Sequence, residues 1–284
     1  MQDEKPSATA WRVALGRAAH QIYDAPKIFD DPLALRIVGA YAQGQSPETF
    51  FSQRYKRSIR TTLLRAVLAV RSRIAEDELA AAVTHGVRQY VLLGAGLDTF
   101  GYRNPHPGVR VFEVDHPATQ AWKRKILGLA AIPEPDSVTY VSVNFERQTA
   151  MDGLIAAGFD ASSPAFFAWL GVTMYLPEET VFAVLRAIAA LPPASGVVFD
   201  YAIAKSEMSL VGRMAVAAVN QRLKQIGEPW VTFFSPGALA THLNALGFHR
   251  IRDLGPKDLN ARYFSGRTDG LRVSSVAHVM TASV

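Results

Sequence analysis

A glycine turn and an acidic residue stand at the spacing that can hold an adenosine group. The turn Gly94-Ala95-Gly96 directly follows the apolar run 90–93, and Asp115 ends a second apolar run about 20 residues later. Glycines after a strand let a ligand approach the backbone, and a carboxylate at the end of the next strand can accept hydrogen bonds from two ribose hydroxyls. These residues predict a site for a cofactor that contains adenosine.

The third glycine of the dinucleotide fingerprint is missing, because Thr99 occupies its position. That glycine lets a helix pack closely behind a pyrophosphate. A cofactor with a ribose but no pyrophosphate does not need it, which favours S-adenosyl-L-methionine over the nicotinamide cofactor of a dehydrogenase. Glu113 lies two residues before Asp115 on the same predicted strand, so both side chains point to one face. We favour Asp115 as the ribose ligand and keep Glu113 as the alternative.

These residues need a sheet to position them, and strand and helix patterns alternate from residue 86 onward. Alternation of this kind predicts right-handed crossovers and a parallel sheet. No long helix is predicted before the last strand, so we expect that strand to insert antiparallel. The expected fold is a seven-stranded, Rossmann-like α/β sheet. Its predicted strands are 90–94, 109–114, 138–143, 165–170, 197–201, 248–254 and 273–281.

Two helical additions accompany the predicted sheet. Residues 1–85 precede it and include a long predicted helix at about 58–83, and residues 203–236 form a helical insertion. Ligands of open α/β sheets bind at the carboxyl ends of the strands. We therefore expect 1–85 to form an N-terminal lid over a cofactor-binding domain at 86–284, with the insertion as a second part of the lid.

Composition excludes several classes of function. The chain has no cysteine, which excludes disulfides, thiolate catalysis and Cys-ligated zinc, and it shows no metal-ligand spacing. No apolar run reaches the roughly 18 residues of a membrane span, and the polar N-terminus has no signal core. We expect a cytoplasmic protein without metal or membrane. The basic run 54–73 lies on a predicted helix without stacking aromatics, so we expect no nucleic-acid partner.

Five longer segments carry a resemblance to one known family, namely 29–32, 91–99, 112–117, 169–177 and 262–264. They are similar to the leucine carboxyl methyltransferase family, in its bacterial branch of S-adenosyl-L-methionine-dependent methyltransferases. The resemblance covers nearly the whole chain. It implies a class I methyltransferase fold, an enzyme, and S-adenosyl-L-methionine as the cofactor.

The resemblance also implies roles for particular residues. An arginine on the helix before the first strand holds the methionine carboxylate, and Arg71 fits that place, with Arg73 as the near alternative. The pair after the third strand that contacts adenine is matched by Asn144-Phe145. Leu170 stands where eukaryotic members carry an acid, which argues against their protein-phosphatase substrate. The expected cofactor-binding residues are Arg71, Gly94, Ala95, Gly96, Asp98, Glu113, Asp115, Asn144, Phe145, Leu170 and Gly171.

Side chains for the methyl acceptor are predicted near the same edge of the sheet. Tyr175 follows the fourth strand and His20 lies on the first helix, so both are candidates for catalysis or for orienting the substrate. Further substrate contacts are expected from the first helix, the insertion and the last loop, namely Arg17, Tyr23, Trp230, Arg262 and Tyr263.

The predicted reaction is O-methylation of a carboxylate on a small-molecule or peptide-like acceptor. A carboxylate is ionised at neutral pH and needs no base, whereas a phenol or alcohol of a secondary metabolite needs one, such as His20 or Tyr175. The sequence also allows a module that binds S-adenosyl-L-methionine without turnover, or an RNA methyltransferase. No pattern in the sequence indicates an oligomeric state.

Overall fold

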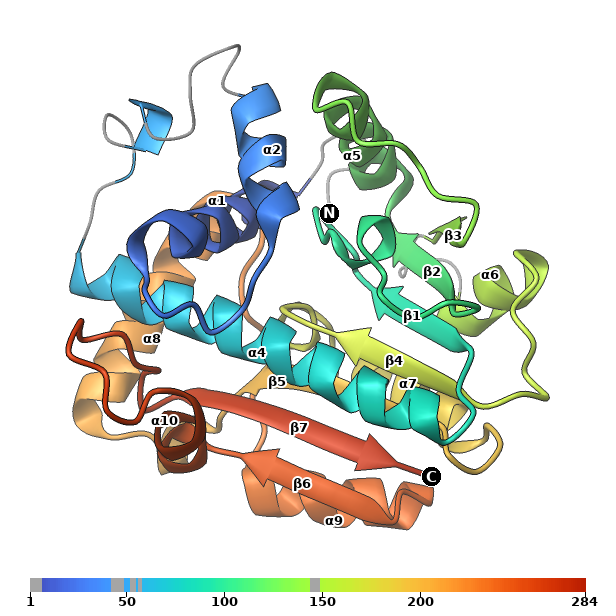
Figure 1. Cartoon of the computed structure of the whole chain (residues 1–284). Helices are drawn as coiled ribbons and strands as arrows, with labels where there is room; N and C mark the ends of the chain where they lie inside the picture. Colours follow the sequence, from blue (N-terminus) through green and yellow to red (C-terminus); the bar gives the residue numbers. More distant parts are fainter. Residues whose placement is uncertain (1–6, 42–48, 52–54, 56–57, 144–148) are drawn as a thin grey trace.

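The computed structural model describes residues 7–41, 49–51, 55, 58–143 and 149–284. Seven strands in these residues form one sheet in the order β3-β2-β1-β4-β5-β7-β6 (Figure 1). The strands are β1 (Gln89–Leu93), β2 (Arg110–Asp115), β3 (Val138–Ser142), β4 (Ala165–Trp169), β5 (Gly196–Ala202), β6 (Arg250–Leu254) and β7 (Ala277–Ser283). Strands β1 to β5 pair in parallel, whereas β7 is antiparallel to both β5 and β6. The predicted seven-stranded sheet with an antiparallel last strand is confirmed.

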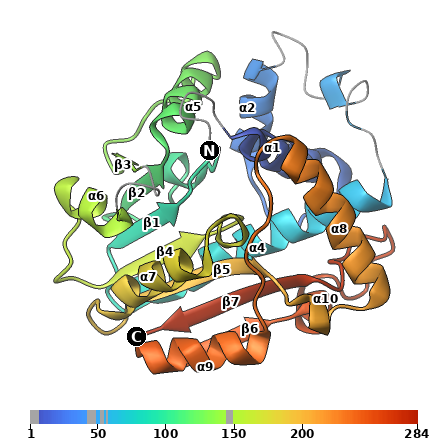
Figure 2. The same ribbon diagram turned by 180° about the vertical axis from the view of Figure 1, so that it is seen from behind.

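Helices cover both faces of the sheet (Figures 1 and 2). One face carries α4 (Ile59–Thr84), α5 (Pro117–Leu129) and α10 (Pro256–Tyr263). The opposite face carries α6 (Ala150–Ala156), α7 (Glu178–Ala189) and α9 (Pro236–Leu246). A sheet covered in this way needs apolar side chains on both of its faces.

The central strands meet that need along their whole length. Every residue of β1 and of β4 is buried, as their nearly continuous apolar sequences predict. Successive side chains of β1 enter opposite cores: Tyr90 and Leu92 belong to the apolar cluster on the α4 side, and Val91 and Leu93 to the cluster on the α7 side. The turn after β1 is therefore held by a strand that cannot shift without exposing both cores.

Three further helices gather beyond the carboxyl ends of the parallel strands (Figure 1). They are α1 (Ala8–Tyr23), α2 (Pro32–Tyr41) and α8 (Leu210–Gln225). The Oγ of Ser7 accepts a hydrogen bond from the N–H of Ala10 and caps α1, which packs against α2 and α4. Helices α1 and α2 of residues 1–85 and helix α8 of the insertion thus lie at the edge where the glycine turn ends β1, whereas α4 covers a face of the sheet. Within the described ranges, no helix combines the length and the apolar character needed to cross a membrane.

The connection between β6 and β7 differs from the expectation of a loop. Residues Pro256–Tyr263 form the short helix α10, so Arg262 and Tyr263 lie at the end of a helix. Pro256 stands at the first helical position and Asp258 in the first turn, both of which favour a helix start. Eight residues are too few to show a clear helical period, which explains why the pattern did not reveal this helix.

Candidate active site

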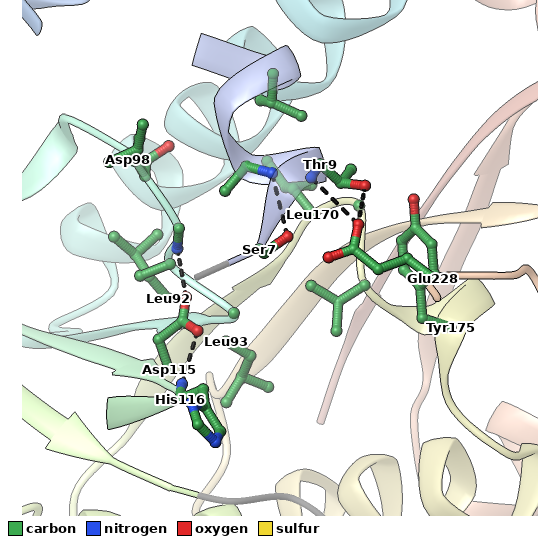
Figure 3. Close-up of a pocket in the computed structure, with 18 of the residues that line it drawn as sticks. Ser7, Thr9, Leu92, Leu93, Asp98, Asp115, His116, Leu170, Tyr175 and Glu228 are labelled. Carbon is green, nitrogen blue, oxygen red and sulfur yellow. Dashed lines mark hydrogen bonds between the residues drawn. The ribbon is translucent and has the colours of Figure 1, made fainter. Parts of the chain in front are cut away.

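A cavity of about 310 Å³ opens at the carboxyl edge of the sheet. Its floor consists of the residues that follow β1, β2 and β4, including the glycine turn, Asp115, Leu170 and Gly171. Residues at the start of α1 and in the loop 227–231 also line it, among them Thr9 and Glu228 (Figure 3). Arg71 of α4 adds a guanidinium to the lining. Most of the expected cofactor residues therefore meet in one place.

The glycine turn has a backbone that other residues rarely adopt. Gly94 and Gly96 have φ angles of +68° and +49°, in the left-handed region that favours glycine. A Cβ atom on Gly94 would lie 2.5 Å from Cγ2 of Val172, which is closer than two carbon atoms can approach. Glycine at this position therefore lets Val172 pack against the turn, and Ala95, Gly96 and Asp98 line the cavity beside it.

Asp115 faces the cavity from the end of β2. Its Oδ2 accepts a hydrogen bond of 2.5 Å from the N–H of Gly96, and its Oδ1 accepts one of 2.7 Å from the N–H of His116. Burial raises the pKa of Asp115, and the two backbone donors oppose that rise. Figure 3 shows the carboxylate held between the glycine turn and the start of α5, where it could accept hydrogen bonds from the hydroxyls of a ribose.

Glu113 does not reach the cavity, and the expectation that it contacts the cofactor is wrong. Glu113 lies two residues before Asp115 on the same face of β2, farther from the end of the strand. Its Oε2 is 2.6 Å from Nζ of Lys123. Both side chains are only 1% exposed. Burial raises the pKa of Glu113, and the charge of Lys123 opposes the rise. Glu113 is the partner of a buried lysine beneath the site.

Arg71 reaches the cavity from α4 and is held there by Asp200 of β5. The Nη1 of Arg71 lies 2.7 Å from Oδ2 of Asp200. Gly171 lies against the same guanidinium, and its N–H donates to the other oxygen of Asp200. Arg73, the alternative from the sequence, is half exposed, pairs with Asp77 and does not line the cavity.

A second arginine, Arg17 of α1, joins the helix to the turn after β1. Its Nη1 lies 2.6 Å from Oδ2 of Asp98, and its Nη2 lies 2.7 Å from Oδ2 of the fully buried Asp31. Burial alone would raise the pKa of Asp98, but the positive charges of Arg17, Lys123 and Arg103 and the N–H of Phe100 lower it to about 2. Arg17 lines the cavity with its charge already matched by two carboxylates.

The other side of the cavity carries Tyr175, Thr9 and Glu228. Burial raises the pKa of the Tyr175 phenol, so its hydroxyl stays protonated at neutral pH. Both the N–H and the Oγ1 of Thr9 donate hydrogen bonds to Oε2 of Glu228. Thr9 and Glu228 were not expected at the site, because their contact joins residues 219 positions apart and no local pattern marks either one.

His20 and Tyr23 lie outside the cavity, which corrects the expectation that they meet the substrate. His20 is 1% exposed, its Nε2 accepts hydrogen bonds from the N–H groups of Ile28 and Phe29, and its Nδ1 lies 2.8 Å from Oδ2 of Asp24. Both ring nitrogens therefore serve the structure around α1. The ring of Tyr23 stacks on the ring of Tyr55 at 5.9 Å and packs against the apolar cluster between α1 and α2.

Three other expected substrate residues are also absent from the lining. Trp230 packs against the apolar cluster on the α7 side, while its neighbours Pro229 and Val231 line the cavity. Arg262 lies over the ring of Tyr263 at the end of α10, and Tyr263 packs against the cluster on the α4 side. Asn144 and Phe145 fall outside the described residues. In the described part of the chain, no group of three or more His, Asp or Glu side chains could hold a metal ion.

Comparisons with known proteins give a family, curated relatives and a similar fold. A model of leucine carboxyl methyltransferase matches residues 10–189. YktD of Bacillus subtilis (strain 168), a candidate S-adenosyl-L-methionine-dependent methyltransferase, is 31% identical, with 99% of each chain covered. FRAAL3718 of Frankia alni, a candidate of the same kind, is 36% identical over 66% of this chain and 65% of its own. The crystal structure of a candidate methyltransferase from Thermobifida fusca has a similar fold, with a TM-score of 0.56 at 17% identity, and the match covers 92% of this chain and 98% of that one.

Proposed function

Because the chain belongs to the leucine carboxyl methyltransferase family and is an S-adenosyl-L-methionine-dependent methyltransferase, we propose that it methylates a carboxylate oxygen of a small-molecule or peptide-like acceptor. The preference for a carboxylate rests on one observation. Among the described residues, the acceptor side of the cavity carries the protonated phenol of Tyr175 and the carboxylate of Glu228, whereas the imidazole of His116 lies beside Asp115 on the opposite side. An acceptor oxygen that is already ionised at neutral pH suits such a site.

The cavity fits the cofactor at three points. The glycine turn presents backbone without side chains at positions 94 and 96, Asp115 presents a carboxylate at the end of β2, and Arg71 presents a buried guanidinium. We assign Asp115 to the ribose hydroxyls and Arg71 to the methionine carboxylate. The N–H groups of Gly94, Ala95 and Gly96 already donate to Val114 and Asp115, so they hold the turn in place. Bound S-adenosyl-L-methionine supplies a methyl group already activated by its positive sulfur, so the chain needs no nucleophile of its own.

On the acceptor side, Tyr175 can donate a hydrogen bond and so orient a carboxylate. Its raised pKa makes it a donor rather than a base. Glu228 also lines the cavity, but a carboxylate is a weak base for an alcohol or phenol. His20, the other candidate base from the sequence, is buried away from the cavity.

We further propose that the first part of the segment 1–85, which contains α1 and α2, acts together with residues 203–236 as a lid, while α4 stays packed on the sheet. The start of α1 and the loop 227–231 both line the cavity, and the hydrogen bonds between Thr9 and Glu228 join them. Closing these segments over two reactants excludes water from the acceptor carboxylate and restricts the approach of its oxygen. Restriction of this kind can supply roughly 7–11 kcal/mol of the barrier.

The test is transfer of an isotope-labelled methyl group from the cofactor to a panel of carboxylic acids, phenols and alcohols. A carboxylate product is a methyl ester, which mild base hydrolyses to labelled methanol, whereas ethers and methylamines keep the label. We expect base-labile label and an ester mass in the product. Base-stable label on a phenol or alcohol would replace the carboxylate assignment.

A further inference from the structure

Glu228 is a charged side chain that binding of the cofactor leaves unexplained. It lies in the loop between α8 and α9 and lines the cavity next to Pro229. Both hydrogen bonds that Thr9 donates go to Oε2, and no described residue donates one to Oε1. Figure 3 shows Oε1 turned away from Thr9 and toward the cavity, on the side opposite Asp115.

The two arginines that line the cavity already form ion pairs with carboxylates other than Glu228. Arg17 pairs with Asp98 and Asp31, and Arg71 pairs with Asp200. Within the described ranges, Glu228 has no ion-pair partner. Glu228 is partly buried, and its carboxylate repels any negatively charged group placed beside it.

We propose that Glu228 forms a subsite for an ammonium group of the acceptor. The inference rests on the proposed function and narrows it to acceptors that carry both a carboxylate and an amine, as amino acids and short peptides do. The accepting carboxylate then faces the positive sulfur, and the ammonium faces Glu228, so each charge meets its opposite. An ammonium that contacts Oε1 makes a charge-assisted hydrogen bond, which is stronger than a neutral one.

The position of Glu228 favours the acceptor over the cofactor as the source of the ammonium. The residues assigned to the cofactor follow the strands β1, β2 and β4 or, like Arg71, reach in from α4. Glu228 approaches from the insertion, in company with Pro229 and Val231 and across the cavity from Asp115. Thr9 fixes Oε2 from a second lid segment and leaves Oε1 as the free acceptor.

The test compares pairs of acids that differ only in the amine, such as phenylalanine with 3-phenylpropanoate and 6-aminohexanoate with hexanoate. For each pair, kcat/KM for base-labile methyl transfer is measured with the wild type, Glu228→Gln and Thr9→Val. We expect the wild type to prefer the amine-bearing member at least tenfold and Glu228→Gln to lose that preference. Thr9→Val keeps the backbone donor to Oε2 and should retain the preference, which separates charge recognition from a purely structural tie.

Each contrary result has its own meaning. Equal ester formation from both members of a pair, in the wild type and in Glu228→Gln, overturns the subsite but leaves the proposed function standing. Base-stable label on the amine overturns the carboxylate assignment, and transfer to neither member overturns both. Affinity for S-adenosylhomocysteine is measured by calorimetry on the same variants. A tenfold loss in Glu228→Gln would place the carboxylate at the ammonium of the cofactor and overturn the subsite.

Discussion

Arg71 of α4 and Asp200 of β5 form an ion pair at the edge of the cavity, with Nη1 2.7 Å from Oδ2 and both side chains 9% exposed. The second oxygen of Asp200 accepts the N–H of Gly171, in the turn after β4. One carboxylate thus positions a helix, a strand end and a turn around the guanidinium. The sequence patterns did not single out Asp200, although it stands near the end of a predicted strand.

Replacing Arg71 tests its assigned role. Arg71→Lys keeps the charge but removes the planar pair of donors that suits a carboxylate, so we expect roughly tenfold weaker binding of S-adenosyl-L-methionine. Arg73→Lys is the matched control, since Arg73 lies two residues away and pairs with Asp77 outside the cavity. Titration calorimetry measures both. A loss in Arg73→Lys with none in Arg71→Lys would reverse the assignment.

Asp115→Ala tests the ribose contact. Two hydrogen bonds to a charged carboxylate contribute about 1.5–3 kcal/mol each, so the affinity for S-adenosyl-L-methionine should fall by at least about 100-fold. Glu113→Gln, on the same strand and face, serves as the comparison. It disturbs the buried pair with Lys123 and should lower the free energy of unfolding by about 3 kcal/mol, with at most a small change in affinity. Unchanged cofactor affinity in Asp115→Ala would contradict the assignment.

Asp98 predicts a pH dependence of stability. Its pKa in the folded chain is about 2, below its ordinary value of 3.8, because Arg17 and other positive charges outweigh its burial. A depressed carboxyl pKa stabilises the folded state above the unfolded pKa, and that contribution is lost as the pH falls from about 4 toward 2. Asp98→Asn should therefore be less stable than the wild type by about 2 kcal/mol at pH 7.

The Asp98 measurement is urea unfolding of the wild type and Asp98→Asn at pH 7, 5, 4 and 3. Because the other acids titrate in both proteins, the difference between the two curves isolates Asp98. We expect that difference to shrink below pH 4. A difference that stays constant from pH 7 to pH 3 would show that the ion pair with Arg17 does not lower the pKa of this group.

Gly94→Ala tests the space above the turn. Its φ of +68° disfavours a side chain, and the new Cβ would lie 2.5 Å from Cγ2 of Val172. We expect a loss of about 1–3 kcal/mol in the free energy of unfolding and weaker cofactor binding. Adding Val172→Ala relieves the contact but not the backbone strain, so the double variant should recover only part of the stability. Full recovery would show that contact alone requires the glycine.

Much of the sheet could be predicted because both of its faces are covered. The buried strands β1 and β4 are then apolar almost throughout, and turn residues separate them from the helices. Helix boundaries also have local signals: Pro236 begins α9, and Gly247 ends it with a φ of +108°. Signals of this kind are local, so a single sequence contains them.

The site was harder to predict because its contacts are not local. Arg71 and Arg73 lie about 200° apart around α4, and this helix is buried on so many sides that the sequence shows no preferred face. The two-residue period of a strand correctly placed Glu113 on the same face as Asp115. That period does not show which of the two side chains is close enough to the strand end to contact a ligand. Whether His20 and Glu228 line the cavity depends on which loops pack beside them. Those contacts form only in the folded chain, so the sequence did not reveal them.

The two backbone donors to Asp115 leave its carboxylate little freedom to turn. The N–H groups of Gly96 and His116 fix one oxygen each, from opposite sides. A sugar must therefore match the carboxylate, because the carboxylate cannot rotate to follow the sugar. Nucleosides whose 2′- or 3′-hydroxyl is missing or inverted should be rejected on stereochemistry alone, so this anchor selects the shape of its ligand as well as its charge.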